Sequence, residues 1–149
     1  MHKIALYSIG KKDAKYYEMI YEDLIKNAKK YATIKMENIF NKKINQAQKQ
    51  QARQIYTQVL MPYLQDYTIA LDPKGEELDS FAFAKVFEKY DKLSFFIGGA
   101  YGFEEDFLHK CDKVVSLSKL TMSHKVAKIV LLEQIFRALS IIHKHPYHK

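Results

Sequence analysis

Three glycines in the C-terminal half are the first residues whose type and spacing could serve a ligand. Gly98, Gly99 and Gly102 follow directly on the apolar run Leu93–Ile97. Glycine permits positive φ angles and lets the backbone approach a ligand closely. The spacing matches neither the dinucleotide-binding pattern nor the P-loop pattern, so both of these phosphate-binding fingerprints are absent. The cluster therefore indicates either a ligand-binding turn or an ordinary tight turn between a strand and a helix.

A second candidate is the loop-like segment 117–122, in which three of six residues are large and apolar. The segment consists of Leu117, Ser118, Lys119, Leu120, Thr121 and Met122. Surface loops are normally more polar than this. A loop that lines an apolar pocket and leaves its backbone amides free could hold an adenine ring. The alternative is a loop that simply packs on the core.

The C-terminal tail is rich in histidine. His143, His145 and His148 flank Pro146 and Tyr147. Structural zinc sites usually need four ligands, and neither a carboxylate nor a second cluster lies near these histidines in the sequence, so we expect no metal site. Titratable side chains of this kind suit proton handling or contact with RNA. A merely frayed terminus is the remaining alternative.

Glu133 and Arg137 are four residues apart on the last predicted helix, which is the spacing of a helix-stabilising ion pair. Apolar residues surround this pair along the helix: Val126, Ile129, Val130, Leu132, Ile135, Phe136, Leu139 and Ile142. This surface is wider than one sheet-facing stripe, so the pattern predicts a subunit interface.

The elements that must position these residues alternate between short strands and longer helices. Predicted strands span Lys3–Ile9, Thr33–Phe40, Tyr67–Leu71, Leu93–Ile97 and Lys113–Leu117. Five helices are predicted. They span Ala14–Tyr31, residues 41–64, residues 79 or 80 to 90, Glu104–Lys110, and residues 123–143; the second begins with the polar stretch Asn41–Gln51 and continues to Leu64, and Asp79 or Ser80 starts the third. Turns are expected at Gly10–Asp13 and at Asp72–Gly75.

This alternation predicts an α/β fold, with a mostly parallel sheet and helices on both faces. The length of 149 residues and the absence of a visible linker indicate a single domain, residues 1–149. Open sheets of this kind bind ligands at the carboxyl ends of their strands. Three such ends stand out, at Leu71-Asp72, at Gly98–Gly102 and at 117–122.

The net charge of +7 lies entirely in the first half of the chain. Residues 1–65 contain 12 Lys and Arg against 5 Asp and Glu, whereas residues 66–149 contain 12 of each. The asymmetry predicts a polyanionic partner, and aromatic and amide residues among the lysines favour RNA over a membrane; a solvated lysine-rich surface is the alternative. A single cysteine, Cys111, and no apolar run near the ~20 residues of a membrane span predict a cytoplasmic protein.

Taken together and in this order, the segments resemble the ribosomal RNA large subunit methyltransferase H family of the SPOUT class. The matching stretches are Leu71-Asp72 with Gly75, Phe96–Gly102, Leu117–His124, Glu133–Ala138 and His145–His148. The resemblance extends over the whole chain and includes its short length. The family often has proline after the paired glycines, where this chain has Ala100.

The resemblance implies a homodimer with a C-terminal trefoil knot and with S-adenosylmethionine bound among three loops. It implies N3-methylation of a pseudouridine in helix 69 of 23S rRNA on the assembled ribosome. The implied cofactor-binding residues are Leu71, Gly98, Gly99, Gly102, Leu117, Ser118, Lys119, Leu120, Thr121 and Met122.

For catalysis, Tyr147 or His148 is the candidate to assist removal of the N3 proton, reaching into the partner's site. Arg137 is the candidate to stabilise negative charge developing on the base. The main alternative is a non-catalytic RNA-binding or ribosome-associated protein, which explains the basic half but leaves the three loops without a role. A metal-dependent hydrolase using the tail histidines is a weaker alternative.

Overall fold

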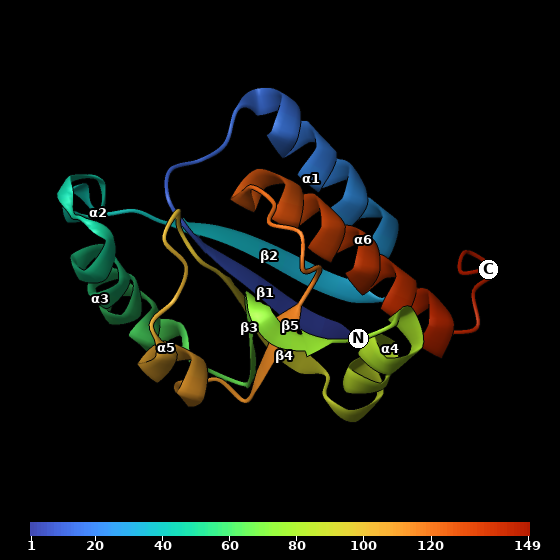
Figure 1. Ribbon diagram of the computed structural model, residues 1–149. Helices are drawn as coiled ribbons and strands as arrows, with labels where there is room; N and C mark the ends of the chain where they lie inside the picture. Colours follow the sequence, from blue (N-terminus) through green and yellow to red (C-terminus); the bar gives the residue numbers. More distant parts are fainter.

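The centre of the molecule is a parallel β-sheet of five strands (Figure 1). The computed structural model describes residues 1–149, apart from the side chain of Asn45. The strands are β1 (His2–Ile9), β2 (Ala32–Ile39), β3 (Tyr67–Glu77), β4 (Lys92–Ile97) and β5 (Lys113–Ser116), in the order β2-β1-β4-β3-β5. The predicted α/β class with a parallel sheet is confirmed.

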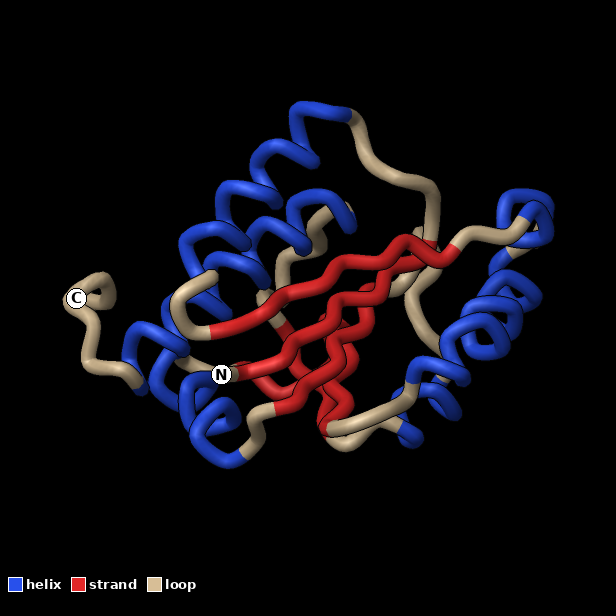
Figure 2. Tube along the Cα trace, turned by 180° about the vertical axis from the view of Figure 1, so that it is seen from behind, coloured by secondary structure: helices blue, strands red, loops and turns tan.

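Helices cover both faces of the sheet (Figure 2). One face carries α1 (Lys15–Ala28), α4 (Ser80–Lys89) and α6 (His124–Ile142); the other carries α2 (Lys42–Gln46), α3 (Lys49–Leu60) and α5 (Glu105–Lys110), with the 3₁₀ turn η1 (Met61–Tyr63) after α3. Two apolar cores result, one on each side of the sheet.

Strand β4 shows why its sequence is mostly apolar, with Ser94 as its one buried polar residue. Phe95 packs into the core beneath α4 and α6, and Phe96 packs into the core beneath α3 and α5. Both side chains are fully buried. Because successive residues of a strand point to opposite faces, a strand covered on both sides favours apolar residues at consecutive positions and not only at alternate ones. The prediction for this strand is confirmed.

Strand β3 is longer than predicted. The turn expected at Asp72–Gly75 is instead an irregularity inside the strand, which pairs with β5 through Leu71 and again through Glu76 and Glu77. Gly75 allows the backbone of β3 to lie close to that of β5 and does not form a turn, because a Cβ atom at this position would lie 2.8 Å from backbone atoms of β5. The sequence prediction was wrong because Pro and Gly also mark bulges, where one strand shifts against its partner.

The helix predicted from Asn41 to Leu64 is interrupted. Helix α2 ends at Gln46, Ala47 is extended, and α3 begins at Lys49. An unbroken helix would place Gln48 on the same face as Ile44 and Ala52, which are both buried. The break buries the two apolar side chains and leaves Gln48 exposed.

The last helix lies between α1 and α4 on the sheet, as Figure 1 shows. Ser123 caps its start by accepting a hydrogen bond from the N–H of Val126 at 3.3 Å. Most of its apolar residues, including Leu132, Ile135 and Leu139, are buried within the chain itself. The width of this apolar surface therefore does not by itself require a second subunit, because α1 and α4 cover its flanks.

Candidate functional site

One cavity of about 550 Å³ lies where the irregularity inside β3 meets the carboxyl ends of β4 and β5. Its lining residues come from β3, from the end of β4 and the segment after it, from the loop after β5 and from the start of α6: Leu71, Asp72, Pro73, Ile97, Gly98, Gly99, Ala100, Gly102, Phe103, Leu117, Ser118, Leu120, Thr121, Met122, Ser123, His124 and Ala127. The volume lies within the range of about 300–1,000 Å³ typical of small-molecule sites.

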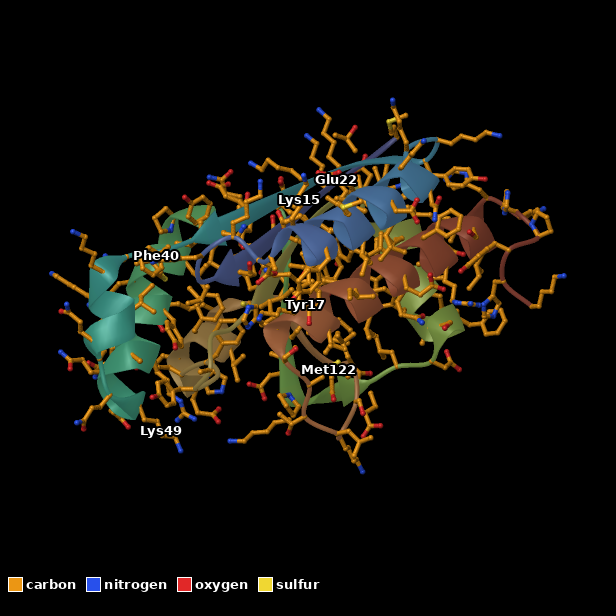
Figure 3. The ribbon with its side chains drawn as sticks, turned by 90° about the horizontal axis from the view of Figure 1, so that it is seen from above. Lys15, Tyr17, Glu22, Phe40, Lys49 and Met122 are labelled. Atoms are coloured by element: carbon orange, nitrogen blue, oxygen red, sulfur yellow. The ribbon has the colours of Figure 1, made fainter. Side chains whose placement is uncertain are left out.

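Nine of the ten residues predicted to bind a cofactor line this cavity. The exception is Lys119, whose side chain is 85% exposed and forms an ion pair with Glu77 at 3.5 Å. Met122, labelled in Figure 3, lies in the loop that leads into α6. The three segments, separated by up to about fifty residues in sequence, thus meet because parallel strands present their carboxyl ends at one edge.

The loop 117–122 is held in shape by its own hydrogen bonds. The hydroxyl of Ser118 accepts from the N–H of Leu120 at 2.9 Å. The hydroxyl of Ser116 donates to the carbonyl oxygen of Ser118 at 3.0 Å. These bonds fix the loop and support a preformed wall of the cavity.

The glycine segment forms a tight turn over α3. The N–H of Gly102 donates to the carbonyl oxygen of Gly99 at 3.1 Å, and Gly102 has a φ of 75°. Gly99 lies against the buried ring of Tyr56, so that a Cβ atom at residue 99 would be 2.5 Å from the Tyr56 hydroxyl. One glycine is thus required for the backbone conformation and another for close packing.

We expect Gly99→Ala to lower the free energy of unfolding by about 1–3 kcal/mol, because the new methyl group overpacks a buried site. The displaced turn also lowers the affinity of the cavity for its ligand. Gly98→Ala is the matched control for stability, since its Cβ would meet no atom closer than 3.4 Å. Urea unfolding of both variants checks the prediction, and equal losses would contradict it.

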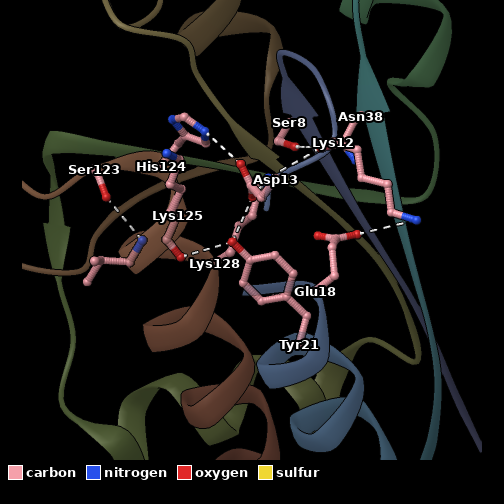
Figure 4. Close-up of polar contacts among 11 residues, drawn as sticks. Ser8, Lys12, Asp13, Glu18, Tyr21, Asn38, Ser123, His124, Lys125 and Lys128 are labelled. Carbon is pink, nitrogen blue, oxygen red and sulfur yellow. Dashed lines mark hydrogen bonds and ion pairs between the residues drawn. The ribbon is translucent and has the colours of Figure 1, made fainter. Parts of the chain in front are cut away.

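A buried ionic cluster lies beside the cavity, between the start of α6 and the ends of β1 and β2 (Figure 4). The carboxylate of Asp13 accepts from the Lys128 ammonium at 2.7 Å, from the Tyr21 hydroxyl at 2.7 Å and from Nε2 of His124 at 3.2 Å. The side chains of Asp13 and Lys128 are each only 2% exposed. Lys128 also donates to the side-chain oxygen of Asn38 at 3.3 Å.

These contacts determine the charge state of Asp13. Burial alone would raise the pKa of this carboxyl group, but the hydrogen bonds from Lys128 and Tyr21 and the positive charge of Lys128 hold the pKa below its usual value. Burial and the adjacent carboxylate in turn raise the pKa of Tyr21, which therefore stays protonated as a donor. The sequence prediction placed Asp13 in a turn and missed this cluster.

The three predicted catalytic residues lie together at the other end of α6. Nε of Arg137 donates to Glu133 at 3.0 Å, which confirms the predicted ion pair. Nη1 of Arg137 contacts Nδ1 of His148 at 3.1 Å, and the Tyr147 hydroxyl donates to Glu133 at 2.8 Å. The tail is therefore folded back on its own helix.

These contacts indicate which ring nitrogen of His148 carries the proton and that the Tyr147 hydroxyl stays protonated. Arginine has no acceptor, so Nδ1 of His148 accepts and Nε2 carries the proton of the neutral ring. The hydrogen bond to Glu133, together with burial, raises the pKa of Tyr147. As folded in one chain, Tyr147 donates to Glu133, whereas His148 accepts from Arg137.

Within one chain the tail cluster does not reach the cavity. Ala127 lines the cavity and Arg137 lies ten residues further along α6, a distance of about 15 Å at 1.5 Å per residue. In Figure 1 the start of α6 lies near the carboxyl ends of the strands, whereas the C-terminus lies beyond the opposite end of the helix. Within one chain, the predicted catalytic residues thus form one group and the predicted cofactor-binding residues form another, and the two groups lie apart.

Three further observations concern the chain as a whole. Cys111 is partly buried, and burial raises its pKa to about 12, so it is a protonated thiol at neutral pH. Across the described side chains, no group of three or more His, Cys, Asp or Glu residues is placed to hold a metal ion. None of the described helices has the length and apolar character needed to cross a membrane.

Comparison with known proteins gives matches along the whole chain. A family model described as a predicted SPOUT methyltransferase matches residues 2–148. The protein named ribosomal RNA large subunit methyltransferase H from a Nitratiruptor species is 61% identical over 153 aligned residues, which cover 100% of both chains. Proteins of the same name from Aliarcobacter butzleri and Helicobacter hepaticus are each 47% identical, with 99% of both chains covered. The resemblance seen in the sequence is confirmed, and the chain belongs to the SPOUT methyltransferase family.

Proposed function

We propose that this protein is an S-adenosylmethionine-dependent methyltransferase of 23S rRNA, acting in the cytoplasm on the assembled ribosome. The proposed target is N3 of a pseudouridine in helix 69. The observation that carries the proposal is the cavity in which residues 71–73 of β3 meet the segments that follow β4 and β5. The names of the relatives support ribosomal RNA as the substrate.

The residues of the cavity fit S-adenosylmethionine. Leu71, Ile97, Leu117 and Met122 offer apolar surface for an adenine ring. The backbone of the glycine turn and of the loop 117–122 offers hydrogen-bonding groups for the ribose and the amino acid part. The cofactor supplies a methyl group that its sulfonium centre has already activated. The protein must then mainly position the base, and proximity of that kind contributes as much as about 7–11 kcal/mol.

The second part of the proposal is a homodimer whose tails complete each other's sites. The separation of Arg137, Tyr147 and His148 from the cavity in one chain supports a site built from two chains. Helix α1, which packs beside α6, exposes the apolar residues Tyr16, Met19 and Ile20, and α6 exposes Val126. Such a patch fits an interface between subunits.

In the assembled site, Arg137 provides a fixed positive charge near the base. This charge stabilises negative charge that develops when the N3 proton leaves. Tyr147 or His148 takes part in removing that proton. Tyr147 donates its proton to Glu133, and Nδ1 of His148 already accepts from Arg137, so taking up the N3 proton requires the tail to leave its own helix.

Membership of the family supports two more features. We propose that the C-terminal part of the chain is threaded as a trefoil knot, which would fix the loops around the cofactor. A part of the basic residues in 1–65 provides contacts with rRNA phosphates.

The basic half of the chain also fits a non-catalytic RNA-binding protein. Titration with S-adenosylmethionine distinguishes the two functions, because a pure RNA-binding protein has no affinity for the methyl donor.

Mass mapping of 23S rRNA tests the proposed function directly. A strain lacking this protein should lack a single methyl group in helix 69, and the purified protein with S-adenosylmethionine should restore it on ribosomes from that strain. An unchanged methylation pattern in the deletion strain would refute the proposed substrate.

A further inference from the structure

A second pocket, of about 320 Å³, adjoins the cofactor cavity and has no role in the proposed function so far. It is lined by the turn 10–14, by Phe40 and by the first turn of α6, with His124 and Lys125. His124 lines both pockets. A ligand in this basic pocket, as we call it below, therefore lies directly beside the place where the methyl donor is proposed to bind.

The basic pocket has an excess of positive charge. Asp13, the carboxylate in its lining, is already balanced by the buried ammonium of Lys128. Lys12 is only loosely paired, with Glu18 at 4.0 Å. Lys11 and Lys125 have no ion pair among the described residues. The ammonium group of Lys11 lies 4.9 Å from the centre of the Phe40 ring, and that of Lys125 lies 5.5 Å from the centre of the Tyr17 ring. The pocket is thus suited to an anion.

The start of α6 adds to this charge. The amino end of a helix carries a partial positive charge and normally attracts acidic residues. The first turn of α6 contains none; His124 is partnered by Asp13, but Lys125 has no ion pair among the described residues and is repelled by this partial charge. A bound anion would remove this repulsion, and violations of local rules of this kind occur mainly at functional sites.

Phe40 indicates what kind of anion fits. It lies at the end of β2, is labelled in Figure 3, and is 38% exposed. Together with the ammonium group of Lys11 it provides a flat apolar surface beside a positive charge. Exposed aromatic rings among lysines are the usual means of holding a nucleotide base and its phosphate in single-stranded RNA.

We propose that the basic pocket binds the RNA chain next to the methylated nucleotide, with a phosphodiester between Lys11 and Lys125 and the neighbouring base against Phe40. This inference rests on the proposed function for the identity of the RNA. The inference assigns a specific RNA contact to residues around the turn 10–14. It therefore differs from the more general proposal that positive charge spread over the N-terminal half binds RNA. Binding there places the substrate base at the mouth of the cofactor cavity.

The test compares two double variants that each remove two lysines. Lys11→Gln with Lys125→Gln removes the proposed phosphate contacts. Lys29→Gln with Lys30→Gln is the matched control, because both residues are exposed and follow α1, at the opposite edge of the sheet. Binding of a 5′-labelled single-stranded RNA of about 12 nucleotides, a length in the range that single-strand sites cover, is measured by anisotropy as a function of salt concentration.

We expect the pocket variant to bind about tenfold more weakly at 0.1 M salt and to lower the slope of log affinity against log salt by about 1–2. The control variant should change neither quantity appreciably. Phe40→Leu should weaken binding about fivefold without changing the salt slope, because it removes stacking and no charge. Unchanged affinity in the pocket variant, or an equal loss in the control, would overturn the site; unchanged affinity in Phe40→Leu would overturn the stacked base.

A second readout separates this inference from the proposed function. With ribosomes from the deletion strain, the pocket variant should raise the KM for ribosomes while its affinity for S-adenosylmethionine stays that of the wild type. If the wild-type protein transferred no methyl group to ribosomes, the proposed function would fail, whereas the RNA-binding comparison would still decide the basic pocket. A pocket variant with wild-type KM would overturn the inference and leave the methyltransferase activity standing.

Discussion

Deletion of Tyr147–Lys149 lowers the rate of methyl transfer by about 10²- to 10⁴-fold, the usual contribution of a group that handles a proton in the transition state. The affinity for S-adenosylmethionine stays unchanged, because no residue of this segment lines the cofactor cavity. Single-turnover transfer to ribosomes measures the first quantity and calorimetric titration the second. A truncated protein with the full rate would show that the tail takes no part in catalysis.

A mixing experiment tests whether the tail acts across the dimer. Met122→Arg places a positive charge in the cavity proposed to hold a sulfonium cation, so this chain should bind no cofactor but keeps its tail. Neither this chain nor the truncated chain is active alone. After mixing in equal amounts, half of the dimers are mixed and each has one complete site of two, so the activity should recover to about one quarter of wild type. No recovery would contradict a site shared between chains.

Local patterns were sufficient to locate the edge of the sheet where the cavity forms. The mostly apolar residues Leu93–Ile97 and the glycines that follow are features of neighbouring residues, and they predicted β4 and its turn. Once the strands are parallel, the irregularity at residues 71–75 of β3 and the turns after β4 and β5 lie at one edge of the sheet. The sequence therefore grouped nine of the cavity residues without any knowledge of distances.

Features that depend on distant pairing were not predictable. The extension of β3 past Asp72 is stabilised by pairing of Glu76 and Glu77 with β5, some forty residues away. The break between α2 and α3 depends on which side chains the opposite face of the sheet can bury. In each case a local signal, a Pro-Gly turn or a run of good helix formers, was overridden by tertiary packing.

Lys128 is the residue whose role the sequence came nearest to revealing. It stands between Ala127 and Leu131 on the apolar face of α6, where a lysine is out of place unless it is paired. The sequence could therefore indicate a buried partner. It could not name Asp13, which is 115 residues away and is brought to Lys128 by the path of the chain between β1 and α1.

The pair Asp13–Lys128 leads to the largest expected effect on stability. Asp13→Asn should lower the free energy of unfolding by about 3–5 kcal/mol, because it leaves the Lys128 ammonium buried without its counter-charge. Asp13→Asn combined with Lys128→Met should be less destabilising than the sum of the two single changes, since no unpaired charge remains. The exposed pair Lys35–Glu37 is the control: Glu37→Gln should cost no more than about 1 kcal/mol.

The contribution of the Asp13 carboxylate to the free energy of unfolding should depend on pH in a defined direction. The pKa of Asp13 in the folded protein lies below its usual value of 3.8, so the carboxylate contributes stability above the unfolded pKa and loses it as the pH falls through the folded pKa. The difference in unfolding free energy between wild type and Asp13→Asn should therefore be constant from pH 7 to about pH 5 and should narrow below about pH 4. Urea unfolding at a series of pH values measures it. A difference that persisted undiminished in acid would mean that the loss comes from the shape of the asparagine and not from the missing charge.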